Sequence, residues 1–440
     1  MLKSVLHQIL ATTPDSLFFH QYVSDRDSVT KIALNELTLQ DSSEEFSLTN
    51  EECSWVASLH NFGRIGGPFL AAFLVDVVGR KPLLITCSLT FFTSWLLILF
   101  TRKVWILYVV RTIIGAAIGV HDTISNVYIA ESCSPKIRGT FASIAMAFFY
   151  AGELIAFILV TYLPYNQVAI VNAAIGCVSL LCVFLLKETV QFLIIKGNYK
   201  SAERNYYWLN GPKTLSTESK FEEIKENIQR ERSKVSFQQL FMSKANFISL
   251  RVILIISVLE MFTGFEAITS FASMAFTKSE FLTPNEFTIL FGLFQFLSIC
   301  FSSFIIDRFN RRTIFLISFF ATTITHCCTS ALYYIHQNLT VMPFFSWLIF
   351  ITITTYATIY SAGILPIYYI VRGEILPQSV KAIGGCMAVF LNSIIGFVTT
   401  KIFLYISNEH GLFILKKTGT ELVAALRSHP QRVSLVAGTI

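Results

Sequence analysis

Charge is scarce in this chain: Asp, Glu, Lys and Arg make up only 14% of its 440 residues, whereas 53% are hydrophobic. The mean hydropathy is +0.59. A soluble domain of this size needs more polar surface than that to cover its core. Repeated apolar runs of about 18 residues or more instead predict a polytopic membrane protein. The formal net charge of +6 is therefore interpreted loop by loop, and not as a nucleic-acid-binding surface.

Several catalytic and metal-binding patterns are also missing. None of the nine cysteines forms a CxxC pair, so we interpret them as packing residues and not as a disulfide framework. The sequence contains no nucleophile–base pattern, phosphate-binding loop or metal-ligand spacing. An enzyme is accordingly the least supported class of protein. We expect no cofactor, no metal and no nucleic-acid partner.

Ten long apolar segments are present, and we predict that each forms a membrane-spanning helix, because lipid offers backbone polar groups no other partner. They cover residues 54–75, 82–100, 104–130, 140–162, 166–186, 248–276, 286–306, 313–335, 343–371 and 381–406. Gly264 can break the helix of the sixth segment. The predicted fold class is an all-α polytopic membrane protein.

The connections between these segments indicate the domain organisation. Basic residues concentrate in alternate connections, which the positive-inside rule places in the cytosol. For the long linker, amphipathic helices and a plain solvated segment are almost equally supported by the charge pattern. A sequon at Asn338 is a weak glycosylation signal on a predicted outer loop. The predicted units are an acidic extramembrane segment (1–53), an N-terminal bundle of five spans (54–186), a cytosolic helical linker (187–247), a C-terminal bundle of five spans (248–406) and a divergent polar tail (407–440).

Two kinds of charged motif occur twice. "DVVGRKP" and "DRFNRRT" follow apolar segments and place an acid shortly before paired basic residues, and "ESCSPKIRG" and "EILPQSVKA" place Glu seven residues before a basic residue. The repeated order predicts a duplicated membrane half, as in many secondary transporters. We predict that the charges form a gate across the inner ends of the two halves, whose partly exposed pairs are each worth about 0–1 kcal/mol. The alternative is topogenic charge without a gating role. The predicted gate comprises Asp76, Arg80, Glu131, Arg138, Asp307, Arg311, Arg312, Glu374 and Lys381.

Longer motifs carry a family resemblance. "DVVGRKP", "VVRTIIGAAIG", "YIAESCSPKIRG", "DRFNRR", "GILPIYYIVRGEILP" and "FLNSIIGFVTTKIF" occur in this order between Ser54 and Phe403. Through them the chain resembles the sugar porter family of the major facilitator superfamily, and most of all the insect facilitated trehalose and hexose transporters. The resemblance implies two pseudo-repeated helical bundles that move a sugar by alternating access. The family has twelve spans, so the ten predicted here imply that the first and last are missing.

The resemblance also implies where the substrate binds. Sugar sites use neutral donors and acceptors, because hydroxyls both give and accept hydrogen bonds. Gln295 and Asn392 match the family at their positions. Elsewhere acids and methionines stand where the family has amides, and a tyrosine stands where it has a tryptophan. The substrate-binding residues implied in this way are Arg111, Met146, Glu260, Met261, Glu266, Gln295, Tyr369 and Asn392.

Acids within the predicted spans need an explanation, because a charge there costs about 2.5–3.5 kcal/mol on insertion scales. His121 and Asp122 lie in the third predicted span, and the acids predicted at membrane depth are Glu153, Glu260 and Glu266. In one interpretation they form a cation or proton site. In a second they stay protonated and donate hydrogen bonds to sugar hydroxyls. In a third they form structural ion pairs with Arg111, Arg372 or His326. The second and third interpretations are preferred to the first.

The first functional prediction is therefore a plasma-membrane carrier of a hexose- or trehalose-type sugar. A non-transporting sugar sensor, or a degenerate truncated paralogue, is the alternative, because several family amides and the end spans are replaced. A carrier of organic cations is a third hypothesis. The expected partners are a small sugar and the lipid bilayer, and the oligomeric state is left open.

Overall fold

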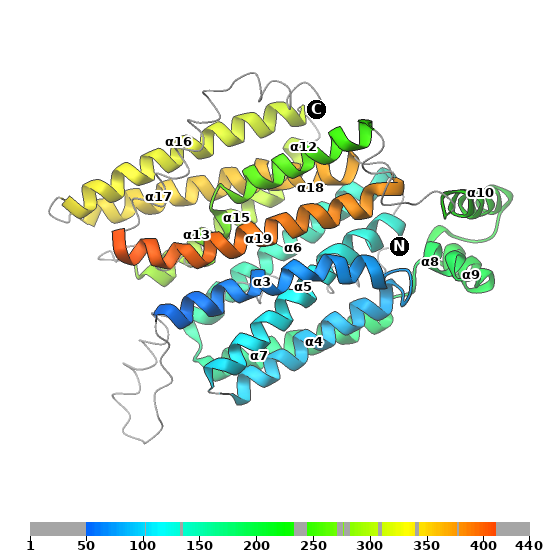
Figure 1. Ribbon diagram of the computed structural model, residues 1–440, viewed down its shortest axis with the longest axis horizontal. Coiled ribbons are helices and arrows are strands. Elements are labelled where there is room, and N and C mark those ends of the chain that lie inside the picture. The colour runs from blue at the N-terminus through cyan, green and yellow to red at the C-terminus, as the bar shows by residue number, and fades with distance from the viewer. Residues whose placement is uncertain are drawn as a thin grey trace.

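The computed structural model describes residues 50–101, 103–132, 135–232, 244–270, 276, 282–306, 310–338, 343–375 and 378–410. Within these residues helices occupy all ten predicted spans (Figure 1). Nine helical segments of the described part are long and apolar enough to cross a membrane, and the more polar first segment is not among them. The predicted all-α polytopic fold is confirmed.

The chain runs through two sets of long helices separated by three shorter ones. The first set is α3 (Asn50–Leu74), α4 (Arg80–Phe100), α5 (Val104–Ser132), α6 (Pro135–Tyr162) and α7 (Tyr165–Leu185). The shorter helices α8 (Val190–Ile195), α9 (Tyr199–Asn210) and α10 (Leu215–Arg232) lie beyond one end of the bundle, at the right of Figure 1. The second set begins with α12 (Lys244–Met261), α13 (Phe265–Ser270), α15 (Pro284–Ile306) and α16 (Arg311–Asn338). Next comes one continuous segment made of α17 (Pro343–Ile359), the π-helical turn η1 (Tyr360–Ile364) and α18 (Leu365–Glu374). The set ends with α19 (Gln378–His410).

Glycines let α3 and α5 pack closely. A Cβ atom at Gly63 of α3, or at Gly115 of α5, would lie 2.0 Å from a backbone oxygen of the other helix. A Cβ atom at Gly67 or Gly119 would lie 2.6 or 2.9 Å from a backbone oxygen of the other helix. Small residues four apart are a common way for membrane helices to bring their backbones together. This close approach fixes the rotation of α3 about its axis, and with it the direction of Arg64.

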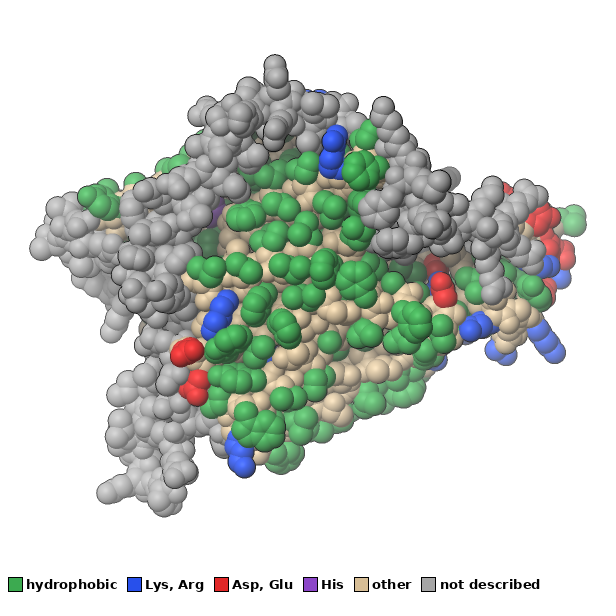
Figure 2. All heavy atoms as spheres, viewed as in Figure 1, with side chains coloured by type: hydrophobic (Ala, Val, Ile, Leu, Met, Phe, Trp, Pro, Cys, Tyr) green, Lys and Arg blue, Asp and Glu red, His purple; other side chains and the backbone are tan. Residues whose placement is uncertain are grey.

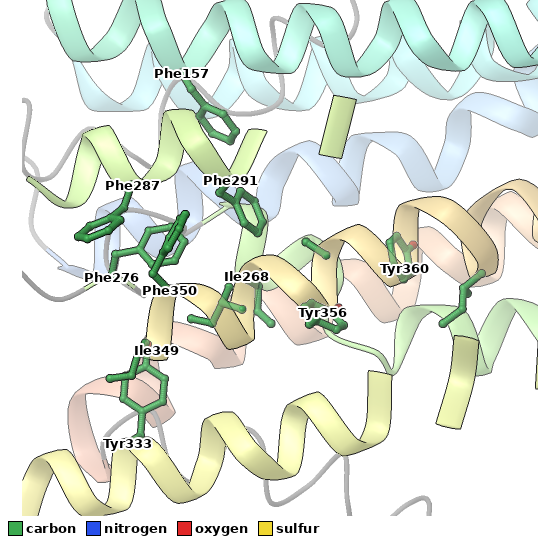
Figure 3. Packing of buried hydrophobic residues seen from close by; sticks show 13 residues of the cluster. Phe157, Ile268, Phe276, Phe287, Phe291, Tyr333, Ile349, Phe350, Tyr356 and Tyr360 are labelled. Atoms are coloured by element: carbon green, nitrogen blue, oxygen red, sulfur yellow. The ribbon is translucent and has the colours of Figure 1, made fainter. Parts of the chain in front are cut away.

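The two halves meet along two seams. In the first seam α3 packs against α19, where the rings of Phe62 and Phe397 lie 5.7 Å apart. In the second seam α6 packs against α15, and Phe157 points toward Phe291 with 6.5 Å between ring centroids (Figure 3). The residues described below as a candidate site lie on helices of these seams and on the helices that pack beside them.

The outer surface is that of a membrane protein. Figure 2 shows hydrophobic side chains over the middle of the face, while charged side chains gather over α8 to α10. Phe73, Phe301 and Ile317 expose 75%, 65% and 64% of their surface. Apolar side chains this exposed are favourable in lipid and unfavourable in water.

The linker helices have a small core of their own. Lys213, two residues before α10, lies 3.0 Å from Glu203 and 3.1 Å from Glu218, and hydrogen bonds to these carboxylates raise its pKa above the ordinary lysine value. Most of the described part of the linker lies in the helices α8, α9 and α10, as one of the two sequence interpretations predicted. Its buried apolar residues are Val190, Ile194, Ala202, Tyr206 and Phe221.

Candidate functional site

The sixth spanning segment is broken at Gly264. The φ of this residue is +72°, in the left-handed region that glycine adopts without strain. The break leaves the carbonyl of Thr263 without a helical partner. Tyr356 donates a hydrogen bond to this carbonyl from its hydroxyl at 3.0 Å, and His326 does so from Nε2 at 3.1 Å. The break therefore puts the two glutamates of this segment on separate helices, α12 and α13.

Glu260, at the end of α12, is buried and held on both oxygens. Tyr360 of the π-helical turn donates to Oε1, and Asn392 of α19 donates from Nδ2 to Oε2 at 3.0 Å. The same Asn392 nitrogen also contacts the hydroxyl of Tyr368 at 3.2 Å. Phe265 stacks on the ring of Tyr360 with 4.0 Å between centroids. The carboxylate is thus satisfied by a hydroxyl and an amide, which is how a buried acid becomes tolerable.

Glu266, on α13, joins the two halves. Its Oε1 lies 3.4 Å from Nη1 of Arg64 on α3, and its Oε2 accepts a hydrogen bond from Nδ2 of Asn61 at 3.2 Å. The second terminal nitrogen of Arg64 lies 2.5 Å from Oδ2 of Asp122 on α5. Gly396 of α19 makes room for this carboxylate, since a Cβ there would lie 2.4 Å from Oε2. Arg64 consequently bridges an acid of its own half and an acid of the other half.

The cation that pairs with Glu266 is thus not one of the three named from the sequence. Arg111 donates from Nε to the carbonyl of Val56 at 3.1 Å, about three helical turns from Asp122 along α5. Arg372 lies over the ring of Tyr369 at 5.1 Å. The prediction that Arg111, Arg372 or His326 pairs with Glu266 is therefore wrong. The packing of α3 against α5 directs Arg64 toward Glu266 instead.

Among the buried amides of the described part of the chain, three that the sequence or the contacts above place in this region keep polar atoms without a hydrogen-bond partner. Gln295 of α15 is fully buried, and neither its oxygen nor its nitrogen is bonded. Gly292, three residues earlier and on the same helix face, packs against Phe157 of α6, so Gln295 lies at the second seam. Asn61 and Asn392 are 2% and 5% exposed and leave Oδ1 unbonded. A buried unsatisfied group costs about 1–3 kcal/mol, which a hydrogen-bonding ligand would remove.

The other predicted substrate-binding residues are placed less closely together. Met261 is buried at the end of α12, and Met146 is half-buried on α6. Tyr369 is half-buried and contacts Tyr368, with 5.2 Å between ring centroids, and Arg372. Glu260, Glu266 and Asn392 therefore form the connected part of the predicted site. Roles in substrate binding for all eight predicted residues stay predictions.

The predicted gate is partly visible at the linker end of the bundle. Arg80 contacts Asp76 at 3.0 Å and Glu131 at 2.8 Å, and Arg80 and Glu131 are nearly buried. Glu188 accepts hydrogen bonds from the backbone nitrogens of Arg80 at 3.2 Å and Lys81 at 3.1 Å. Asp76, Arg80, Lys81 and Glu131 belong to the N-terminal half, and Glu188 belongs to the linker that follows it. None of these contacts reaches the C-terminal half, so they do not form the predicted pairing across the halves.

The C-terminal copy of the gate is mostly outside the described residues. Arg311 is half-buried and Arg312 is exposed at the start of α16. Their function as gate residues remains a prediction. Asp307 lies outside the described residues, and so do the side chains of Glu374 and Lys381. The side chains of Arg138, from the N-terminal copy, and of Asn338, the predicted glycosylation residue, also lie outside them.

The sequence-based site omitted Arg64, Asn61 and Tyr360. Arg64 had a clear signal, because no other Lys or Arg lies within α3. An inventory of cations inside the first span would have found it, since intramembrane charges usually face the bundle interior and pair. Asn61 and Tyr360 gave no comparable signal, because an uncharged polar residue in a span is not unusual.

Known proteins with similar sequences and structures are sugar transporters. The family model described as "Sugar (and other) transporter" matches residues 11–425. The facilitated trehalose transporters of Bombyx mori and Apis mellifera ligustica are each 28% identical, over 81% of this chain and 71% of theirs. The xylose transporter XylE from E. coli, in a partially occluded inward-open conformation, matches with a TM-score of 0.75 and 17% identity, over 96% of this chain and 97% of that chain. This last likeness concerns the fold alone.

Proposed function

This chain belongs to the sugar transporter family of the major facilitator superfamily, and we propose that it moves a hexose- or trehalose-type sugar across the plasma membrane by alternating access. Membership in this family makes it a multi-pass membrane transporter and not an enzyme. The proposed sugar class comes from its relatives, since those named above are described as trehalose transporters.

The observation that supports a sugar most directly is the unbonded amide of Gln295. A primary amide presents both a donor and an acceptor, and a sugar hydroxyl can satisfy either end. A simple cation would satisfy only the oxygen, and a carboxylate would satisfy only the nitrogen. A neutral hydroxylated ligand is therefore the best complement to this buried side chain.

The arrangement of polar groups supports alternating access. Asn61 and Arg64 come from the N-terminal half, whereas Glu266 and Asn392 come from the C-terminal half. A ligand among these groups touches both halves at once. Rocking of the halves around such a central site is the usual mechanism of transporters built from two repeated bundles.

The proposal is tested with purified chain in proteoliposomes and labelled glucose and trehalose. We expect saturable uptake and counterflow of one of the two sugars. Gln295→Leu should weaken the apparent affinity roughly 5- to 30-fold, because a buried hydrogen-bonding group of the site is lost. Gln167→Leu, at an exposed amide near the start of α7, is the matched control and should leave uptake unchanged.

Two results would change the interpretation. Binding without saturable uptake would favour a non-transporting sensor. Normal sugar affinity in Gln295→Leu would place the ligand elsewhere. Imaging of the tagged chain in cells tests the plasma-membrane part of the proposal, and retention in an internal membrane would contradict it.

A further inference from the structure

The two buried glutamates each hold one asparagine by its amide nitrogen. Nδ2 of Asn392 lies 3.0 Å from Oε2 of Glu260, and Nδ2 of Asn61 lies 3.2 Å from Oε2 of Glu266. An ionised carboxylate accepts hydrogen bonds and cannot donate them, so each contact fixes which end of the amide faces it. The oxygens of both asparagines are then left buried and unbonded in the described structure.

The two asparagines lie beside one region, although they come from opposite halves. Gly396 lies one helical turn after Asn392, so both occupy the same face of α19. A Cβ at Gly396 would lie 2.4 Å from Oε2 of Glu266 and 3.1 Å from Nδ2 of Asn61. The face of α19 that carries Asn392 therefore meets Asn61 and Glu266 at the α3–α19 seam.

The charge of this region is not balanced. Arg64 is shared between Asp122 and Glu266. Arg372 lies over the rings of two tyrosines. Glu260 has a hydroxyl and an amide as its hydrogen-bond donors, and no ion pair to it occurs among the described residues. Among the described residues, the region consequently presents unbonded acceptors beside a carboxylate that has no direct ion pair.

We propose that this carrier selects its sugar through hydrogen-bond donors and prefers a sugar that bears an ammonium group facing Asn61 and Asn392. The inference rests on the proposed function as a sugar carrier and names its substrate class more narrowly. A hydroxyl can donate to either asparagine oxygen. An ammonium group donates as well, forms stronger charge-assisted bonds and compensates Glu260. A fluorine or carbonyl at the same position would face these oxygens without a proton to share.

The experiment measures binding to the purified full chain in nanodiscs. Labelled glucose or trehalose, whichever binds, is displaced by derivatives that carry hydroxyl, ammonium or fluorine at the same carbon, one carbon at a time. At the carbon that faces the asparagines, fluorine should bind roughly 5- to 30-fold more weakly than hydroxyl. The ammonium derivative should bind about 3-fold or more tightly than the parent, because its bonds are charge-assisted.

Glu260→Gln provides the matched variant. A glutamine can offer either its nitrogen or its oxygen to Asn392, so the asparagine is free to turn its donor toward the ligand. We expect the ratio of the affinities for the ammonium and hydroxyl derivatives to fall to about 1 in this variant, and this ratio is compared whatever the affinity for the parent sugar becomes. Glu222→Gln, at an exposed acid of α10, should keep the wild-type order.

The outcomes separate this inference from the proposed function. The order ammonium, hydroxyl, fluorine, lost in Glu260→Gln, supports the inference. Equal binding of hydroxyl and fluorine derivatives at every carbon, or weakest binding of the ammonium derivatives, overturns it. The expected order without uptake in vesicles refutes transport but leaves the inference standing. Absence of binding by every sugar in the series refutes both.

Discussion

Replacing Arg64 by methionine removes the cation that bridges Asp122 and Glu266 but keeps a long side chain in place. The two N–O distances are 2.5 and 3.4 Å, and the side chains of Arg64 and Glu266 are both 14% exposed. At an effective dielectric constant of about 20, two unit charges about 4 Å apart attract by about 4 kcal/mol. Water weakens the attraction between Arg64 and Asp122, because the side chain of Asp122 is 27% exposed. We therefore expect a loss of about 3 kcal/mol in the free energy of unfolding, at the lower edge of the usual range for a broken buried pair.

The assay is unfolding in mixed micelles, with a double-mutant cycle that combines Arg64→Met and Glu266→Gln. Arg64→Met alone takes the cation away from two carboxylates, and the double variant also neutralises Glu266, the more buried of the two. The two substitutions should therefore be coupled by about 1–3 kcal/mol. Lys225→Met is the control, because it removes a surface pair with Glu222 at 2.9 Å. That control should change the free energy of unfolding by less than about 0.5 kcal/mol.

Two results would refute this reasoning about Arg64. Wild-type stability of Arg64→Met would mean that its charge does not stabilise the neighbouring acids. Additive effects of the two substitutions would mean that Arg64 and Glu266 are not in contact. In that case the free energy of unfolding of Asp122→Asn is measured. A loss there would show that the stabilising pair is Arg64 with Asp122, within the N-terminal half.

Three further predictions concern the backbone, and the same unfolding assay measures each. Gly63→Ala puts a Cβ 2.0 Å from the carbonyl oxygen of Thr112 and should lower the free energy of unfolding by about 1–3 kcal/mol. Its control is Gly66→Ala, which places a Cβ in open space and should not lower it. Equal effects of the two substitutions would contradict the close packing of α3 and α5. Glu188→Ala removes the acceptor at the N-terminus of α4 and should cost about 0.5–2 kcal/mol, so an unchanged midpoint would show that this cap contributes nothing. Gly264→Ala should lower the free energy of unfolding by about 1–2 kcal/mol, because the φ of Gly264 is +72°. Gly264→Asn should lower it less, because asparagine adopts the left-handed region more easily than alanine. A larger loss in Gly264→Asn than in Gly264→Ala would rule out a left-handed residue at the helix break.

The helices could be predicted closely from the sequence. α4 was predicted at 82–100 and is found at Arg80–Phe100, and α7 was predicted at 166–186 and is found at Tyr165–Leu185. Both predictions depend on one physical constraint, because a backbone in lipid must bond to itself. The break at Gly264 was also accessible, since glycine is the residue that adopts its conformation most easily.

The partners inside the bundle could not be predicted in the same way. Arg64 and Glu266 are 202 residues apart, and Glu260 and Tyr360 are 100 apart. Which side of a membrane helix faces inward depends on how its neighbours pack, and a helix that is apolar on most sides gives little periodic signal. The π-helical turn that carries Tyr360 adds to the difficulty, because it shifts the register of the residues that follow.

The contacts of the two glutamates favour one way for these acids to act in a sugar site. If they were protonated donors aimed at a sugar, the protein would leave an oxygen of each one free for the ligand. Instead Glu260 is held by Tyr360 and Asn392, and Glu266 is held by Arg64 and Asn61. Their direct effect is on the orientation of the two asparagines. Substituting either glutamate by glutamine keeps its volume but releases that orientation. Such variants should therefore change the choice among sugars more than the strength of binding to any one sugar.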